Sequence, residues 1–387
     1  MNSFGSALSQ HPDPAVAVGE TVGSVLEQVG PTPDLAVLVL SGAPPRVGQE
    51  VADAVHRLLA PRALVGAASS GVLVDDTEVE RDWAVGLWAA RSLPSQVVRL
   101  ETIHDDAGSV VVGMPDGAAH DNATLLLFSD RSSFPIGALN QAAREQYPSL
   151  RIVGGVTNAD QPQLFANADV FHDGAVGVLL GRSRVVGFGV AQGCRPLGSP
   201  FTVTTAKGNK VLELGFQPAL ARLRESLAGS GLDQDALPAG LHLGIVTQDT
   251  AGAPMASEII MRAILGVDQL DGSLAVGARV EVGATVQFHV SDPVQATANL
   301  LAELAHHGGA SALAFASASR GAKFFDEPHH DAATIHAALP SRALLGMFCS
   351  GEIAPGNGRN LVHGYSTSVL FLNEQSQPGK VDTVVDY

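Results

Sequence analysis

Two thiols, Cys194 and Cys349, are the chain's simplest candidates for covalent chemistry. Cys349 ends a predicted buried strand and opens a polar turn, so its thiolate could act as a nucleophile if a base such as His363 lay within hydrogen-bonding reach. Most free cysteines are instead small buried hydrophobes. Because the sequence shows neither a contact with a base nor an electropositive setting, a buried thiol is favoured. A thiol-dependent hydrolase or transferase that uses Cys349 remains the alternative.

Three short turns rich in Gly, Ser, Thr and Asn offer a different chemistry, that of ligand binding. They cover residues 66–71, 154–160 and 346–352, and each follows a predicted buried strand. In α/β sheets, ligands bind at the carboxyl ends of parallel strands, where backbone N–H groups and short polar side chains are accessible. If the repeated units bring these turns together, we expect them to form one polar pocket.

Charged residues near the third turn indicate what such a pocket would hold. Arg320 follows a predicted strand, and Glu352, Arg359, Asn360 and His363 follow the turn itself. An arginine pairs bidentately with a carboxylate, and a glutamate holds an ammonium group, so together they suit an amino acid or a similar small polar solute. In the alternative interpretation, Arg320 and Glu352 pair with each other or with the backbone.

Other catalytic signatures fail on their spacing. Residues 42–48 follow a strand as a phosphate loop would, but they lack the Gly-Lys-Ser/Thr ending, and residues 187–193 miss the dinucleotide fingerprint. The adjacent histidine pairs that begin at His306 and His329 point in different directions on a helix and lack the spacing of a tetrahedral zinc site. We therefore expect no metal, no cofactor and no catalytic residue.

The composition narrows the class of protein. The chain has 387 residues, of which 45% are hydrophobic and 16% charged, so it can bury a core and is not disordered. A net charge of −16 repels phosphate backbones and anionic lipid, which argues against nucleic-acid binding and against a membrane surface. No apolar run approaches the roughly 20 residues of a membrane span, and the first basic residue is Arg46, which is unlike a signal peptide. A cytoplasmic protein is expected.

Three strand, helix, strand units must position the turns. Residues 35–40, 47–59 and 62–65 form the first, residues 124–128, 136–147 and 151–153 the second, and residues 311–316, 332–339 and 342–345 the third. The first and third share the pattern Arg-Ala-Leu-x-Gly-x-x-x-Ser-Gly, which predicts an internal duplication.

Strands of period two accompany these units. We expect residues 176–180 to form a hairpin with 185–190, and 273–276 another with 285–290. The expected fold is therefore mixed α/β, in two related halves built from repeated β-α-β units with antiparallel hairpins.

An ordered series of motifs resembles the FIST domain family. They are Gly154-Gly-Val-Thr-Asn-Ala-Asp160, residues 170–178, residues 201–209 with Glu213-Leu214 and Pro218-Ala-Leu220, Ile264-Leu-Gly-Val-Asp268, and Cys349-Ser-Gly-Glu-Ile-Ala-Pro355 with His363. The resemblance covers roughly residues 34–372. With a boundary placed in the Gly- and Pro-containing stretch 228–240, it implies a tail and helix at 1–33, an N-terminal FIST domain at 34–228, a C-terminal one at 229–372 and a tail at 373–387.

The resemblance implies a cytoplasmic sensory module that binds small ligands such as amino acids and passes a signal to an unidentified partner protein or through self-association. Relatives that carry F-box segments keep a protein-interaction scaffold open as a further alternative. The family pattern often has Cys where Ala316 and Ser317 stand, and Arg where Ser291 stands. From the motif and the charged residues together, the candidate ligand contacts are Asn158, Arg320, Gly321, Cys349, Ser350, Gly351, Glu352 and Arg359.

Overall fold

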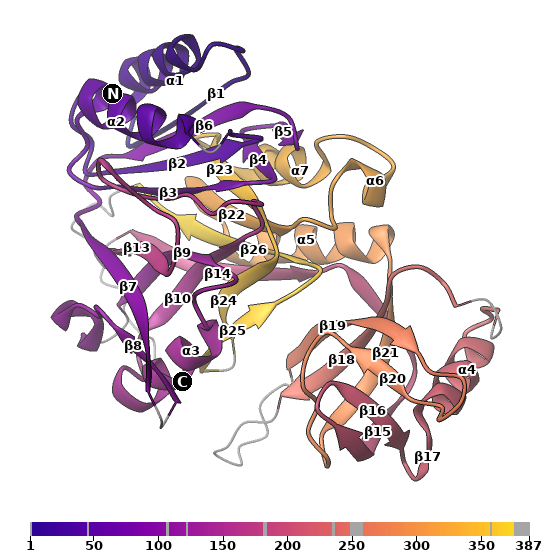
Figure 1. The fold of residues 1–387 in the computed structure, drawn as a ribbon. Helices are drawn as coiled ribbons and strands as arrows, with labels where there is room; N and C mark the ends of the chain where they lie inside the picture. Colours follow the sequence, from indigo (N-terminus) through magenta and orange to yellow (C-terminus); the bar gives the residue numbers. More distant parts are fainter. Residues whose placement is uncertain are drawn as a thin grey trace, which may run out of the picture.

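The computed structural model describes residues 2–44, 46–105, 108–120, 123–180, 184–233, 237–247, 258–356 and 358–374. It consists of a large body, built from three mixed sheets with helices on their outer faces, and a smaller β-rich lobe formed by residues 194–291 (Figure 1). The mixed α/β class predicted from the sequence is confirmed.

Each of the three predicted units is a parallel strand pair joined by helix, and each lies in a different sheet. Their strands are almost fully buried, because apolar runs without alternation fit sheets that are covered on both faces. The units are β2(Leu35–Ser41), α2(Val47–Leu59) and β3(Leu64–Ser69); β9(Thr124–Asp130), α3(Ile136–Gln146) and β10(Arg151–Thr157); and β22(Ser311–Ser317), α6(Ala322–Phe325), α7(His330–Ala338) and β23(Ala343–Cys349).

All three sheets repeat one topology, so the repeat extends beyond the three predicted strand, helix, strand units to the strands that flank them. The first strand of each unit pairs with an antiparallel strand that follows later in the chain, and that strand pairs in turn with one that precedes the unit. These flanking strands are β6(Ala84–Ala90) with β1(Phe4–Ser9), β13(Ala175–Leu180) with β7(Ser95–Asp105), and β26(Ser366–Leu372) with β14(Val185–Gln192). β7 also pairs with the antiparallel strand β8(Gly108–Val112), and a 3-10 turn at Asp116–Ala119 follows β8.

The second strand of each unit leads into a hairpin that joins another unit's sheet. The hairpin after β3 pairs with β23, the one after β10 pairs with β3, and the one after β23 pairs with β10. The exchange is therefore cyclic, and every sheet is completed by another part of the chain. The hairpins are β4(Gly71–Val74) with β5(Thr77–Glu80), β11(Leu164–Ala166) with β12(Asp169–Phe171), and β24(Gly351–Gly356) with β25(Arg359–His363).

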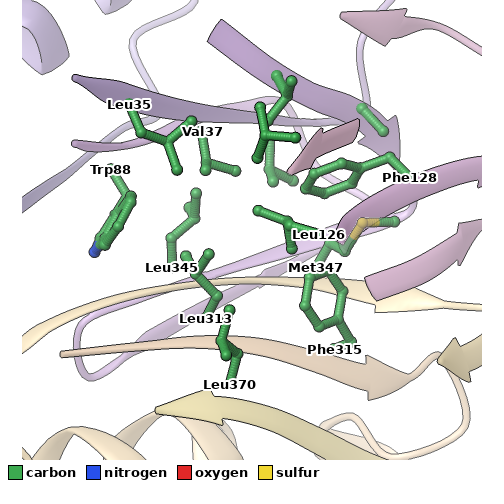
Figure 2. Packing of buried hydrophobic residues seen from close by; sticks show 14 of the residues in the cluster. Leu35, Val37, Trp88, Leu126, Phe128, Leu313, Phe315, Leu345, Met347 and Leu370 are labelled. Atoms are coloured by element: carbon green, nitrogen blue, oxygen red, sulfur yellow. The ribbon is translucent and has the colours of Figure 1, made fainter. Parts of the chain in front are cut away.

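The inner faces of the three sheets share one hydrophobic core (Figure 2). Trp88, Phe128 and Phe315 come from different sheets, and the Phe128 and Phe315 rings meet edge to face with their centroids 5.8 Å apart. The indole N–H of Trp88 donates to Ser311 Oγ at 2.9 Å, which satisfies its single polar group. Because the core draws on all units, no unit can bury its inner face alone.

Helices cover the outer faces. α1(Pro14–Val29) and α2 pack on the first sheet, α3 on the second, and α5(Pro293–His307) with α7 on the third. Asp13 caps α1 and Asp292 caps α5, and in each case the next residue is a proline. This is a favourable helix start, because proline has no N–H to leave unpaired there.

The lobe is an antiparallel barrel with its own core. Its strands follow one another in the order β15-β21-β18-β19-β20-β16, and β16 pairs back to β15, so the sheet closes. Residues on both sides of position 228, the predicted domain boundary, contribute to this core. The elements are β15(Cys194–Lys207), β16(Lys210–Leu214), β17(Gln217–Pro218), α4(Ala219–Gly229), β18(Leu241–Thr247), β19(Glu258–Val267), β20(Leu274–Val276) and β21(Thr285–Ser291).

Two predicted hairpins are wrong, although their strands exist. β13 and β14 belong to different sheets, and β20 pairs with β16 and β19 while β21 pairs with β15 and β18. An alternation of apolar and polar residues indicates that a strand is buried on one face, but it does not indicate which strand lies beside it.

Candidate functional site

The three polar turns meet, as their predicted role requires. Ser69 Oγ donates to the carbonyl of Phe348, and Thr157 Oγ1 donates to that of Ala68. The N–H of Ser350 donates to the carbonyl of Val156 at 2.9 Å, and this bond closes a ring through all three units. The short hydroxyl side chains thus bond the turns to one another, and separate clefts border this joint instead of one shared pocket.

Asn158 lines the first of these clefts. Its Oδ1 accepts from the N–H of Ser70 at 2.9 Å and from Ser69 Oγ at 3.0 Å, and its Nδ2 donates to Ser70 Oγ at 2.7 Å. The cleft has a volume of about 560 Å³ and is also lined by Arg81 and Asp160. Because the Asn158 amide bonds mainly to the first turn, it positions that turn against the second.

The larger cleft, here called the interlobe cleft, lies between the body and the lobe and has a volume of about 730 Å³. This falls within the usual range of small-molecule pockets, about 300–1,000 Å³. Ser350 and Gly351 line it from the third turn, and β19 lines it from the lobe; β19 and β25 can be followed in Figure 1.

Three arginines give the interlobe cleft its charge. Arg131 lines it from the body, and Arg262 and Arg279 line it from the lobe. Among the described residues that line the cleft there is no aspartate or glutamate. In a chain with a net charge of −16, a lining whose charged side chains are all arginines is an electrostatic exception, and it favours a negatively charged ligand.

Arg262 is the best-held of the three guanidinium groups. Its Nη1 donates to the carbonyl of Met261 at 2.8 Å and its Nη2 to that of Val362 at 3.1 Å, so it links β19 to β25. Burial lowers its pKa, yet an arginine remains charged at neutral pH. Two of its five N–H donors are engaged in these bonds with described residues.

His363 and Tyr365 line the cleft beside Arg262. Burial, with a smaller contribution from the charge of Arg262, lowers the pKa of His363 to about 4, so its imidazole is neutral at pH 7. Burial raises the pKa of Tyr365, which keeps its phenol protonated, and its ring packs on His242 with 3.8 Å between the ring centroids. The cleft therefore adds neutral polar groups to a fixed positive charge.

Arg320 lies behind the interlobe cleft and is bonded to the chain's own Asp331. Its Nε and Nη2 donate to the two carboxylate oxygens at 2.8 and 3.0 Å. Thr367 Oγ1 donates to Asp331 at 2.6 Å, and His330 Nδ1 lies 3.0 Å from the same carboxylate. Arg320 is 1% exposed and Asp331 0% exposed, and Arg320 lines neither cleft. The bidentate partner expected for Arg320 is thus supplied internally, and it is not Glu352.

Glu352 is also completely buried. Ser366 donates to its Oε2 through Oγ at 2.8 Å and through the backbone N–H at 3.3 Å, and no described group hydrogen-bonds to Oε1. Burial raises the pKa of Glu352 to about 8. At neutral pH the carboxyl is therefore protonated, and a neutral buried carboxyl does not attract the ammonium group of a ligand.

Cys349 is 0% exposed and its side chain packs against Gly155, where a Cβ would overlap the sulfur. Its Sγ donates to the carbonyl of Met347 at 3.5 Å. Burial, followed by the nearby Glu352, raises the thiol pKa well above its usual value. Since the thiolate is the nucleophile, this environment opposes the chemistry of a thiol-dependent hydrolase or transferase.

Both thiols are expected to react slowly with a disulfide reagent such as Ellman's reagent in the native protein. Cys194 is also buried, and burial raises its pKa to about 12. Reaction requires local opening, so native rates should be at least about a hundredfold below those in urea. Stopped-flow absorbance measures these rates, and Cys194→Ala isolates Cys349. If native Cys349 reacted as fast as the unfolded thiol, the alternative of a thiol-dependent enzyme would become the leading hypothesis.

The remaining predicted residues lie away from the interlobe cleft. Gly321 leaves room for the Glu80 carboxylate, which a Cβ at position 321 would overlap, and Glu80 Oε1 accepts from the N–H of Ala322 at 2.7 Å. Arg359 lines a third pocket beside α3. Of the eight predicted contacts, only Ser350 and Gly351 line the interlobe cleft.

Sequence reasoning missed the residues that give this cleft its character. Arg262 could have been noticed, because it is the only charged residue within the apolar run 259–267. Arg131 and Arg279 lie in loops and Tyr365 in a short connection, and their spacing carries no signal. Only the docking of the lobe against the body brings these four residues together.

The described parts of the chain contain no group of three His, Cys, Asp or Glu side chains arranged to hold a metal ion. Within the same residues, no helix combines the length and the apolar character needed to cross a membrane.

Comparisons with known proteins cover nearly the whole chain. The model of the FIST N domain matches residues 34–217, and that of the FIST C domain matches residues 219–355. An uncharacterized protein of Mycobacterium tuberculosis (strain CDC 1551 / Oshkosh) is 35% identical over 386 residues, which cover 96% of this chain and 100% of the relative. An uncharacterized protein of Mycobacterium bovis is 35% identical over 385 residues, with 96% and 99% covered.

Proposed function

The chain belongs to the FIST family, and from this premise we propose that it is a sensor that binds a small carboxylate-bearing metabolite in the interlobe cleft. FIST is a proposed small-ligand sensory domain. The observation that carries the proposal is the convergence of Arg131, Arg262 and Arg279 on one cleft without a lining carboxylate.

The charges favour a carboxylate as the recognised group. Arg279 pairs with Glu281 at 2.8 Å and both side chains are largely exposed, so its charge is partly neutralised and screened. Arg262 is more deeply buried and is fixed by two carbonyls, which makes it the anchor for a ligand carboxylate. Organic acids fit this lining better than zwitterions, because Glu352, a carboxyl close behind the cleft, is neutral at pH 7, and Asp331 is already paired with Arg320.

Such a ligand would bridge the body and the lobe, because the interlobe cleft is lined by both. The lobe joins the body through two adjacent passages, at Gly193 and at Asp292, and the N–H of Asp292 donates to the carbonyl of Gly193 at 3.0 Å. A ligand held by Arg262 on one side and by Ser350 or His363 on the other would favour one lobe position. A partner protein, or a second copy of the chain, would then bind preferentially to the protein with the lobe in that position.

A thermal-shift screen at constant ionic strength tests the proposal. We expect a small organic acid to stabilise the protein by about 2.7 kcal/mol at a concentration of 100 times its Kd. Arg262→Gln should abolish that shift while leaving the unliganded fold intact. Arg57→Gln is the matched control, because Arg57 is exposed on α2 and its bond is to the Asp53 carbonyl of its own helix.

The panel should contain monocarboxylates, dicarboxylates, 2-oxo acids and amino acids. Stabilisation by none of them at millimolar concentration would count against the sensor. Equal loss of binding in Arg262→Gln and Arg57→Gln would instead remove the interlobe cleft as the binding site.

A further inference from the structure

The interlobe cleft has an apolar side as well as its arginines. From the body it is lined by Phe134, Ile136 and Val156, which are almost completely buried in the core beneath α3. From the lobe it is lined by Leu265, whose side chain is 65% exposed. Among the described residues of the lining, Leu265 is the only large apolar residue that is exposed, so most of the apolar surface left to cover in the cleft is its own.

A β-bulge presents Leu265 to the cleft. The pairing of β19 with β20 shifts register between Ile264 and Gly266, so Leu265 is an extra residue without a partner on β20. Ile264, the residue before it, packs against the core of the lobe. Bulges re-aim side chains and are frequent beside functional sites. This bulge places a leucine outside the lobe core at the point where β19 borders the cleft.

Leu265 also lies close to the arginine that anchors the carboxylate. It follows Arg262 by three positions, which corresponds to about 10 Å along an extended strand. Both residues line the same cleft of about 730 Å³. One small molecule can therefore place its carboxylate at Arg262 and its other end against Leu265. A second charged group at that end would lose water to an apolar side chain that offers no hydrogen bond in return.

We propose that the ligand of the interlobe cleft is a monocarboxylate with an apolar tail, and that Leu265 determines this specificity. The inference rests on the proposed function, because the tail extends a ligand whose carboxylate Arg262 holds. A single exposed leucine is ordinary on a protein surface, as Leu270 is, 99% exposed on a turn of the same lobe. Leu265 differs, because it stands on a bulge inside a cleft. An apolar tail against it removes both surfaces from water and thereby adds affinity.

Isothermal titration of the full chain with sodium butanoate, hexanoate and octanoate at constant ionic strength tests this inference. Each added methylene group should tighten binding about three- to fourfold, which is the usual effect of burying one. Octanedioate should bind at least about tenfold more weakly than octanoate, because its second carboxylate would lie against the leucine.

Leu265→Ser should weaken octanoate binding about tenfold and change butanoate binding by less than about twofold. Leu270→Ser is the matched control, because it makes the same change at an exposed leucine of the lobe that is not among the residues lining the cleft. It should bind all three acids as the unchanged protein does. Both leucines are exposed, so both variants should fold.

The outcomes separate this inference from the proposed function. Equal affinity for acids of every length, or tighter binding of octanedioate than of octanoate, would overturn the apolar tail and leave the sensor in place. Equal effects of Leu265→Ser and Leu270→Ser would overturn the role of Leu265. Binding of no acid, or octanoate binding that Arg262→Gln leaves intact, would overturn the proposed function and this inference with it. A change in sedimenting mass without a change in affinity would assign Leu265 to a contact between copies instead.

Discussion

Asp331→Asn is expected to lower the free energy of unfolding by about 3–5 kcal/mol, because it leaves the charge of Arg320 buried without its counter-charge. Both side chains are fully enclosed, and the carboxylate also accepts from Thr367. Asparagine keeps the shape but loses the charge and one strong acceptor. Urea denaturation followed by circular dichroism measures the loss as a lower midpoint at an unchanged slope.

The matched control for this variant is Glu281→Gln, which removes one charge from the exposed Arg279–Glu281 pair. An exposed pair contributes about 0–1 kcal/mol, so the control should barely change stability. If Asp331→Asn cost no more than the control, the buried pair would not be a major support of the fold. The double variant Arg320→Met with Asp331→Asn should cost less than the sum of the single variants, because the uncompensated charge is gone.

The pH dependence of this pair follows from the Asp331 pKa. Burial alone would raise that pKa, but Arg320, His330 and Thr367 outweigh burial and hold it below its usual value. A carboxyl whose pKa is lowered by folding contributes stability above its unfolded pKa, about 3.9, and loses it as the pH falls through the folded value. The difference between the protein and Asp331→Asn should therefore shrink only below about pH 4.

Glu352→Gln is expected to stabilise the protein at pH 8, in contrast to most changes of a buried polar residue. Folding raises the pKa of Glu352 to about 8 from a usual value of 4.5, so the unfolded chain loses this proton first as the pH rises. The stability that the protonated Glu352 contributes is fully present below about pH 4.5 and falls by at most about 1.4 kcal/mol per pH unit up to the folded pKa. Glutamine is neutral throughout and can still accept from Ser366.

The measurement compares urea midpoints of the protein and of Glu352→Gln between pH 5 and pH 8.5. The gain should be small at pH 5 and should grow to at most about 5 kcal/mol at pH 8. Glu78, whose pKa burial raises to about 7, titrates in the same window, but it does so equally in both proteins and cancels from the difference. Parallel pH profiles would mean that Glu352 is ionised in the fold, with a partner that satisfies its charge.

Local patterns predicted the repeated units well. The apolar runs at 35–40, 124–128 and 311–316 are strands buried on both faces, and each is followed by helix and a parallel strand. The resemblance to the FIST family, carried by an ordered series of motifs, is confirmed by the family models. Cys349 is buried, which its position at the end of an apolar strand favoured.

The candidate site could not be predicted to the same extent. Arg320 does pair bidentately with a carboxylate, but that carboxylate belongs to Asp331, eleven positions away in the chain. The Asn158 side chain bonds to the turn of another unit. The arginines of the interlobe cleft were missed, because Arg131 and Arg262 meet only across the joint between body and lobe.

The sequence by itself determined which segments are buried, which of them are strands or helices, and that the units repeat, because these properties depend on neighbours a few positions away. The tertiary structure alone decided that the hairpins are exchanged cyclically, that Ser69, Thr157 and Ser350 close one ring, and that arginines from separate elements share one cleft. A strand edge and a charge are satisfied by any complementary partner, and only the packing of the whole chain selects the one that is used.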